Sequence, residues 1–86
     1  MKKILVVDDD VQFAELMLKA LRFFGHEAVH AGDAKQALKL YDSQTVSLVL
    51  TDLIMPDMEG VELIMALRRR NPGVKIIAMS GGGRRK

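Results

Sequence analysis

Cysteine is absent from the 86 residues, which excludes a disulfide and a thiolate metal site and fits a reducing cytoplasm. Long apolar runs are missing too, since the first run, residues 4–7, is too short for a signal-peptide core and none approaches the ~20 residues of a membrane span. The net charge is only +2, and the basic clusters at residues 68–70 and 84–86 are typical of a solvated helix end and a loose tail. We therefore expect a cytoplasmic protein that binds neither a membrane nor nucleic acid.

The residues that are present have ordinary globular composition, 49% hydrophobic and 28% charged, which predicts one domain over residues 1–86. Four apolar runs predict strands, and three amphipathic stretches between them predict helices. Loops of ordinary length join them, so the alternating order favours an α/β fold with a parallel sheet and helices on both faces. The predicted strands are residues 4–7, 27–31, 47–51 and 74–79, and the predicted helices are residues 11–24, the stretch after Asp33 with its apolar stripe Ala34, Ala37, Leu38 and Tyr41, and residues 61–70.

Oxygen-bearing side chains follow three of the four predicted strands. Asp8 and Asp9 come after the first strand, Asp52 after the third and Ser80 after the fourth. Ligand sites of open α/β sheets lie at the carboxyl ends of the strands, so these side chains should converge. Clustered carboxylates repel one another unless a cation neutralises them, and Mg²⁺ prefers oxygen ligands. A carboxylate beside Mg²⁺ can attack a phosphoryl group and form an aspartyl phosphate.

The alternative interpretation of these aspartates is that they cap the elements that follow them. We favour capping for Asp10, and for Gly25 and Asp33 at two other helix ends. For Asp8, Asp9 and Asp52 together we favour a metal and phosphoryl site. His26 and His30 flank the second strand and are expected to lie far from this acidic crevice, as surface or packing residues.

Three segments of the chain resemble the receiver family of two-component signalling. Residues 4–10 read Ile-Leu-Val-Val-Asp-Asp-Asp, residues 50–60 contain D-x-x-M-P-x-x-x-G beginning at Asp52, and residues 76–81 read Ile-Ile-Ala-Met-Ser-Gly. The resemblance covers essentially the whole chain. It implies a flavodoxin-like (CheY-like) three-layer α/β fold whose parallel sheet has the strand order 2-1-3-4.

The resemblance also implies roles for individual residues. Asp52 is implied to be the phospho-acceptor, and Ser80 the hydroxyl that hydrogen-bonds the phosphoryl group and couples it to loop movement. Asp8, Asp9, Asp52 and the backbone carbonyl of Ile54 are implied to hold Mg²⁺, Asp9 directly and Asp8 partly through water. The implied partner is a histidine kinase or phosphotransfer protein. The implied module is not an enzyme, beyond phosphorylating and dephosphorylating itself.

The sequence departs from the family pattern after Ser80. Receivers continue there through a helix, a strand and a helix, which carry a lysine that pairs with the phosphoryl group and an aromatic switch residue. We expect a receiver truncated after the fourth strand, and Lys86, six residues after Ser80 on a glycine-rich stretch, is not an adequate replacement for that lysine. Apolar residues spread over roughly 220° of the first predicted helix, more than a sheet covers, so we expect a homodimer or larger assembly.

The sequence therefore leaves two alternative functions. The first is a receiver that takes phosphate on Asp52 with Mg²⁺. The alternative is a non-signalling truncated receiver that acts as a self-associating protein-interaction module. A metal-dependent phosphohydrolase is disfavoured because no additional acid–base residue is evident near the crevice. A nucleotide loop at residues 81–83 is disfavoured because no Walker-type pattern precedes the glycines.

Overall fold

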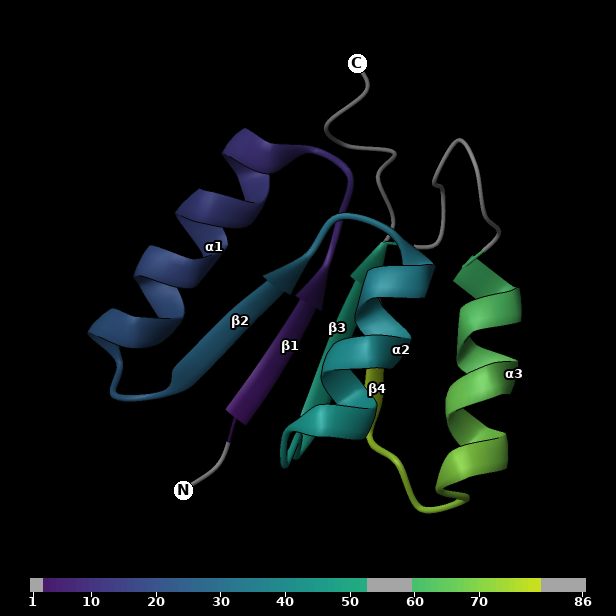
Figure 1. Ribbon diagram of the computed structural model, residues 1–86. Helices are drawn as coiled ribbons and strands as arrows, with labels where there is room; N and C mark the ends of the chain where they lie inside the picture. Colours follow the sequence, from purple (N-terminus) through teal and green to yellow (C-terminus); the bar gives the residue numbers. More distant parts are fainter. Residues whose placement is uncertain (1–2, 53–59, 80–86) are drawn as a thin grey trace.

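The elements alternate between strand and helix, as predicted (Figure 1). The computed structural model describes residues 3–52 and 60–79, and the structural statements that follow concern these residues. No helix among them is long and apolar enough to cross a membrane. The elements are β1 (Lys3–Val7), α1 (Val11–Phe23), β2 (Glu27–Ala31), α2 (Ala34–Ser43), β3 (Leu48–Asp52), α3 (Gly60–Arg70) and β4 (Ile76–Met79).

The four strands form one parallel sheet in the order β2-β1-β3-β4, which confirms the predicted strand order. All the pairings are parallel, so the carboxyl ends of the strands lie together at one edge, toward which the arrows of β1, β2 and β3 point in Figure 1. The register pairs Val7 of β1 with Ala31 of β2 on one side and with Thr51 of β3 on the other. The residues just after these positions therefore gather at one edge of the sheet.

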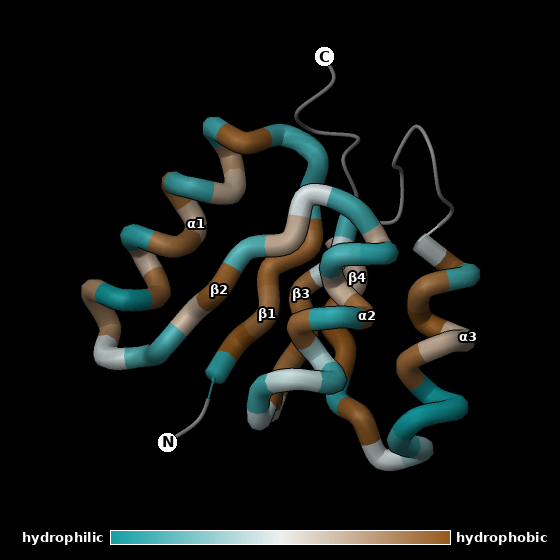
Figure 2. Tube along the Cα trace, in the orientation of Figure 1, coloured by the Kyte–Doolittle hydropathy of each residue, from teal (hydrophilic) through white to brown (hydrophobic). Residues whose placement is uncertain are grey.

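Alternation along the strands produces two apolar cores, one on each face of the sheet. Leu5, Val7 and Val49 pack with buried residues of α2 and α3. Ile4 and Val6 point to the opposite face and pack with α1. Figure 2 shows the hydrophobic residues concentrated along β1 between these helices. The result is the three-layer arrangement predicted from the sequence.

The helix ends form where the sequence predicts them. Asp10 is the N-cap of α1, and its side chain accepts a hydrogen bond from the Phe13 amide at 3.1 Å. Asp33 caps α2 in the same way. Gly25 follows α1 with a φ of +91°, a left-handed conformation that glycine adopts without steric cost, and its amide donates to Arg22 O.

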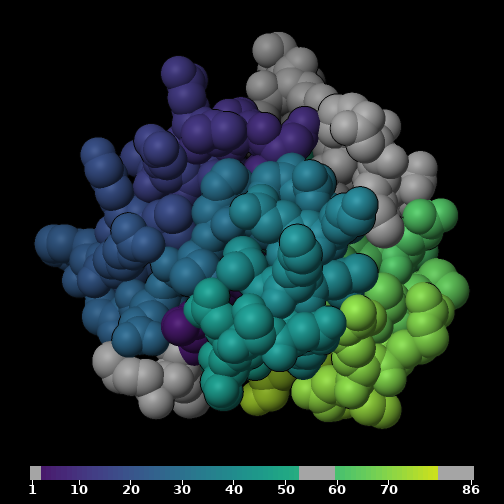
Figure 3. Space-filling view, viewed as in Figure 1, coloured from purple at the N-terminus to yellow at the C-terminus, as the bar shows by residue number. Residues whose placement is uncertain are grey.

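The two faces of the sheet are covered unequally. α2 and α3 adjoin in the space-filling view (Figure 3) and bury Leu63 and Leu67 completely against the sheet. On the other face α1 buries only Ala14 fully. Five large apolar side chains of α1, its C-cap and β4 are left exposed: Val11, Leu16, Phe23, Phe24 and Ile77.

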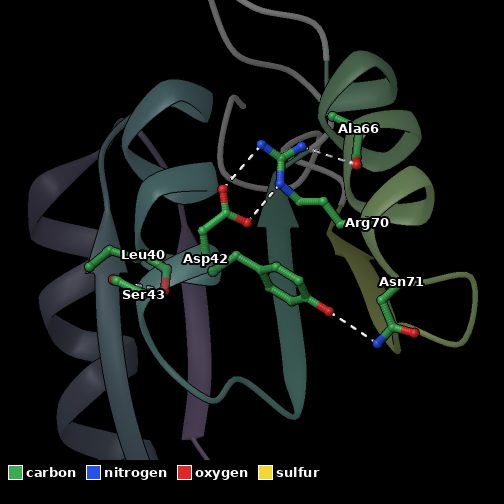
Figure 4. Close-up of polar contacts among 7 residues, drawn as sticks. Leu40, Asp42, Ser43, Ala66, Arg70 and Asn71 are labelled. Carbon is green, nitrogen blue, oxygen red and sulfur yellow. Dashed lines mark hydrogen bonds and ion pairs between the residues drawn. The ribbon is translucent and has the colours of Figure 1, made fainter.

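A polar contact joins the carboxyl-terminal ends of α2 and α3 (Figure 4). Arg70 donates to Asp42 through Nε at 2.8 Å and through Nη2 at 3.2 Å. This hydrogen bonding raises the pKa of Arg70 above its already high usual value. Asn71 Nδ2 donates to the Tyr41 hydroxyl at 3.2 Å. One member of the basic cluster at residues 68–70 is thus paired with a carboxylate.

Candidate functional site

Three carboxylates meet at the carboxyl edge of the sheet. Asp8 directly follows β1, Asp52 is the last residue of the adjacent β3, and Asp9 is next along the loop. Oxygen atoms of these three side chains lie within 4.8 Å of one another. Asp8 and Asp52 are fully buried, whereas Asp9 is exposed. The structure therefore brings together three of the side chains that the sequence singled out.

The spacing of the three carboxylates fits one divalent cation. Oxygen ligands lie about 2.0–2.6 Å from Mg²⁺ or Ca²⁺, so two ligands of one ion are at most about 4–5 Å apart. The oxygens of Asp8, Asp9 and Asp52, within 4.8 Å of one another, satisfy the limit for Ca²⁺, and they would have to approach by several tenths of an ångström to bind Mg²⁺ together. Three like charges in a partly desolvated pocket repel one another, and a bound cation removes this cost. The donor set, all carboxylate oxygen, is the kind that hard cations prefer.

Backbone and side-chain hydrogen bonds hold Asp8 in place. Its amide donates to Ala31 O of β2 at 3.1 Å, and its Oδ1 accepts from the Asp10 amide at 2.9 Å. The carboxylate of Asp10 accepts from the Phe13 amide at the start of α1, so its predicted capping role is confirmed, and Asp10 is not a member of the group formed by Asp8, Asp9 and Asp52.

His30 contacts the site, contrary to the expectation that it lies far from the acidic crevice. Its Nε2 is 2.7 Å from the backbone carbonyl oxygen of Asp8. The expectation was wrong because strand order alone does not say which residues of β2 lie beside the end of β1, and the register does. His30 pairs with Val6, which is two residues before Asp8 on the neighbouring strand β1. The side chain of His30 therefore lies near the end of β1. His26, at the other end of β2, is exposed and lies away from the carboxylates.

Two of the predicted site residues, Ile54 and Ser80, lie outside the described residues. Their proposed contributions, a backbone carbonyl and a hydroxyl, stay predictions. The described part of the site is therefore its acidic half, with Asp8, Asp9 and Asp52.

Comparison with known proteins identifies the family. The sequence profile of the response regulator receiver domain matches residues 4–86. The response regulator receiver protein CpdR of Brucella abortus is 33% identical over 81 residues, which is 94% of this chain and 68% of CpdR. The chain therefore belongs to the response regulator receiver domain family, whose members are signalling modules of two-component systems.

Solved receiver structures have the same fold. The response regulator TrrA of Thermotoga maritima, crystallised in complex with Mg²⁺-BeF, is 36% identical and superposes with a TM-score of 0.88 over 94% of this chain and 70% of TrrA. TrrA in complex with the histidine kinase ThkA gives a TM-score of 0.86 at 36% identity, over 93% of this chain and 69% of that chain. These neighbours confirm the flavodoxin-like receiver fold.

The chain spans only part of some longer relatives. The probable transcriptional regulatory protein TcrX of Mycobacterium tuberculosis is 35% identical over 77 residues, which is 90% of this chain but 33% of TcrX. The likeness therefore concerns 33% of TcrX.

Proposed function

We propose that this chain is the phospho-acceptor module of a two-component phosphorelay, with Asp52 as the residue that is phosphorylated. The observation that carries the proposal is the cluster of Asp8, Asp9 and Asp52 at the carboxyl edge of a receiver fold, two of them fully buried. A buried carboxylate is costly, and its placement beside two others has a chemical use at a phosphoryl-transfer site.

The proposed reaction is a displacement at phosphorus. A carboxylate oxygen of Asp52 attacks the phosphoryl group, a new P–O bond forms, and the bond to the donor breaks with its electron pair leaving on the donor. Bound Mg²⁺ would neutralise charge on the carboxylates and the phosphoryl oxygens. Asp8, Asp9, Asp52 and the Ile54 carbonyl would hold the ion, and Ser80 would donate a hydrogen bond to a phosphoryl oxygen.

A histidine kinase or phosphotransfer protein is the proposed donor. The complex of TrrA with the histidine kinase ThkA supports this assignment, since the match covers 93% of this chain and 69% of the chain in the complex. Beyond its own phosphorylation and dephosphorylation we propose no enzymatic activity.

The test is phosphorylation by acetyl phosphate in the presence of Mg²⁺, read as intact mass. Wild type should gain one phosphoryl group, and Asp52→Asn should gain none. Asp10→Asn is the matched control, because it removes a neighbouring carboxylate outside the cluster while asparagine still caps the helix. Equal adducts on wild type and Asp52→Asn, or no adduct on either, would remove Asp52 as the acceptor.

A second proposal, self-association, is favoured by the uneven cover of the sheet. β4 lies at one edge of the described sheet, and Ile77 in it is 52% exposed. On α1, the helix that covers this face of the sheet, Leu16 is 65% exposed. An open strand edge is matched by a second strand, and a two-fold pair of β4 strands would supply both edges from copies of one chain. Light scattering should find a dimer, and a folded monomer at micromolar concentration would overturn this proposal.

A further inference from the structure

The contact between His30 and the Asp8 carbonyl links strand β2 to the acidic site. We propose that His30 is a positioning residue, which holds the Asp8–Asp9 peptide so that both carboxylates face a common cation. The inference rests on the proposed function, since it concerns the same Mg²⁺ site. Three observations carry it: the short hydrogen bond, its place in the register, and the convergence of other bonds on Asp8.

The direction of the hydrogen bond follows from its acceptor. A backbone carbonyl oxygen only accepts, so the Nε2 of His30, 2.7 Å away, must carry a proton and donate. Both the neutral imidazole with its proton on Nε2 and the doubly protonated ring satisfy this requirement. The role therefore does not depend on a change in the charge of His30. The half-buried position of the ring partly shields the bond from water.

The bonded carbonyl belongs to the peptide unit that leads into Asp9. Fixing its oxygen fixes the plane of that peptide, and with it the direction in which the chain leaves Asp8. The Asp8 amide is held by Ala31 O of the same strand. β2 therefore holds both backbone polar groups of Asp8. The main chain of Ala31 accepts from the Asp8 amide, and the side chain of His30 donates to the Asp8 carbonyl.

Asp9 is restrained through its two neighbours, Asp8 and Asp10. The Asp10 amide donates to Asp8 Oδ1 at 2.9 Å, and Asp10 is the N-cap of α1. Asp9 is thus bracketed by a residue tied to β2 and a residue tied to α1. Such bracketing matters because repulsion among three carboxylates would otherwise swing the exposed Asp9 outward. A site held in its binding geometry before the cation arrives loses less entropy on binding.

The experiment compares Mg²⁺ binding by three histidine variants, measured from backbone amide shifts of residues 8–10 in NMR titrations. His30→Leu removes the donor, and Mg²⁺ affinity should fall about 3- to 10-fold. His30→Gln offers an amide NH₂ near the position of Nε2 and should recover most of that loss. His26→Leu is the matched control on the exposed end of β2 and should bind as wild type does.

Thermal unfolding without Mg²⁺ separates positioning from a merely structural role. If His30→Leu melts lower but its folded state binds Mg²⁺ with wild-type affinity, the proposal is wrong. Equal loss in the Gln and Leu variants would also overturn it, because the donated bond would then not matter. If His30→Leu does not fold, the proposal is tested with the Gln variant and with the imidazole ¹⁵N shifts of wild type. A ring without a proton on Nε2 would contradict the proposal. If wild type binds no Mg²⁺ at all, the proposed metal site itself fails.

Discussion

At the scale of single residues, the acidic cluster should cost stability when no cation is present. Asp9 is exposed and contributes one of the three clustered charges, so Asp9→Asn relieves repulsion without opening a cavity. In EDTA we expect this variant to be more stable than wild type by about 1 kcal/mol, the size typical when a functional site is relaxed. Chemical denaturation with and without Mg²⁺ measures the effect.

The same measurement contains its control. Mg²⁺ should stabilise wild type through binding to the folded state, and should stabilise Asp9→Asn less because one ligand is weakened. Asp10→Asn keeps the helix cap and lies outside the cluster, so its response to Mg²⁺ should match wild type. A loss of stability in Asp9→Asn without Mg²⁺ would mean that repulsion does not dominate at this site.

Residue by residue, the sequence predicted that Asp8, Asp9 and Asp52 lie together, but it did not predict the contact between His30 and Asp8. Asp8 and Asp52 could be placed together because adjacent parallel strands end at one edge, whatever the exact register. The contact of His30 with Asp8 depends on the register itself, with Val6 opposite His30. A shift of one residue would turn the histidine to the other face of the sheet, and nothing in the local sequence fixes that shift.

At the scale of elements, replacing a leucine by alanine should lower the free energy of unfolding far more at Leu67 of α3 than at Leu16 of α1. Leu67 is fully buried between α3 and the sheet, whereas Leu16 on α1 is 65% exposed. Leu67→Ala removes buried apolar contacts and leaves a cavity, so we expect a loss of about 3 kcal/mol. The identical substitution at Leu16 should change the unfolding free energy by less than about 0.5 kcal/mol. Denaturation at low protein concentration checks both, and a comparable loss at Leu16 would contradict the exposed position of that helix face.

Helix ends were easier to predict than strand ends, for a physical reason. Helix ends depend on local roles that the residue type itself predicts. Two aspartates, Asp10 and Asp33, are N-caps, and Gly25 adopts a left-handed turn. The fourth strand was predicted from residue 74 but begins at Ile76. Val74 is buried and apolar like a strand residue, yet its amide donates to Asn71 O in the turn after α3. Burial alone therefore does not indicate strand pairing.

At the scale of the whole molecule, the uneven cover of the sheet predicts that two copies of the chain associate through β4. Ile77 on edge strand β4 is 52% exposed, and Met65 on α3, which covers the opposite face, is 53% exposed. Burying Ile77 against a second copy would make a charge there costly. Ile77→Lys should therefore shift the protein to monomer in sedimentation velocity, while Met65→Lys, a charge at equal exposure, should leave association unchanged.

Circular dichroism on both lysine variants ensures that folded proteins are compared, and an unchanged assembly in folded Ile77→Lys would exclude the β4 interface. Adding Mg²⁺ with beryllofluoride to wild type then relates assembly to the acidic site. A ligand shifts an equilibrium only when it binds the two states with different affinity. A change in the dimer fraction that Asp52→Asn abolishes would couple the acidic site to assembly. An unchanged fraction, with the ligand shown to bind, favours a self-associating module in which the acidic site has no part.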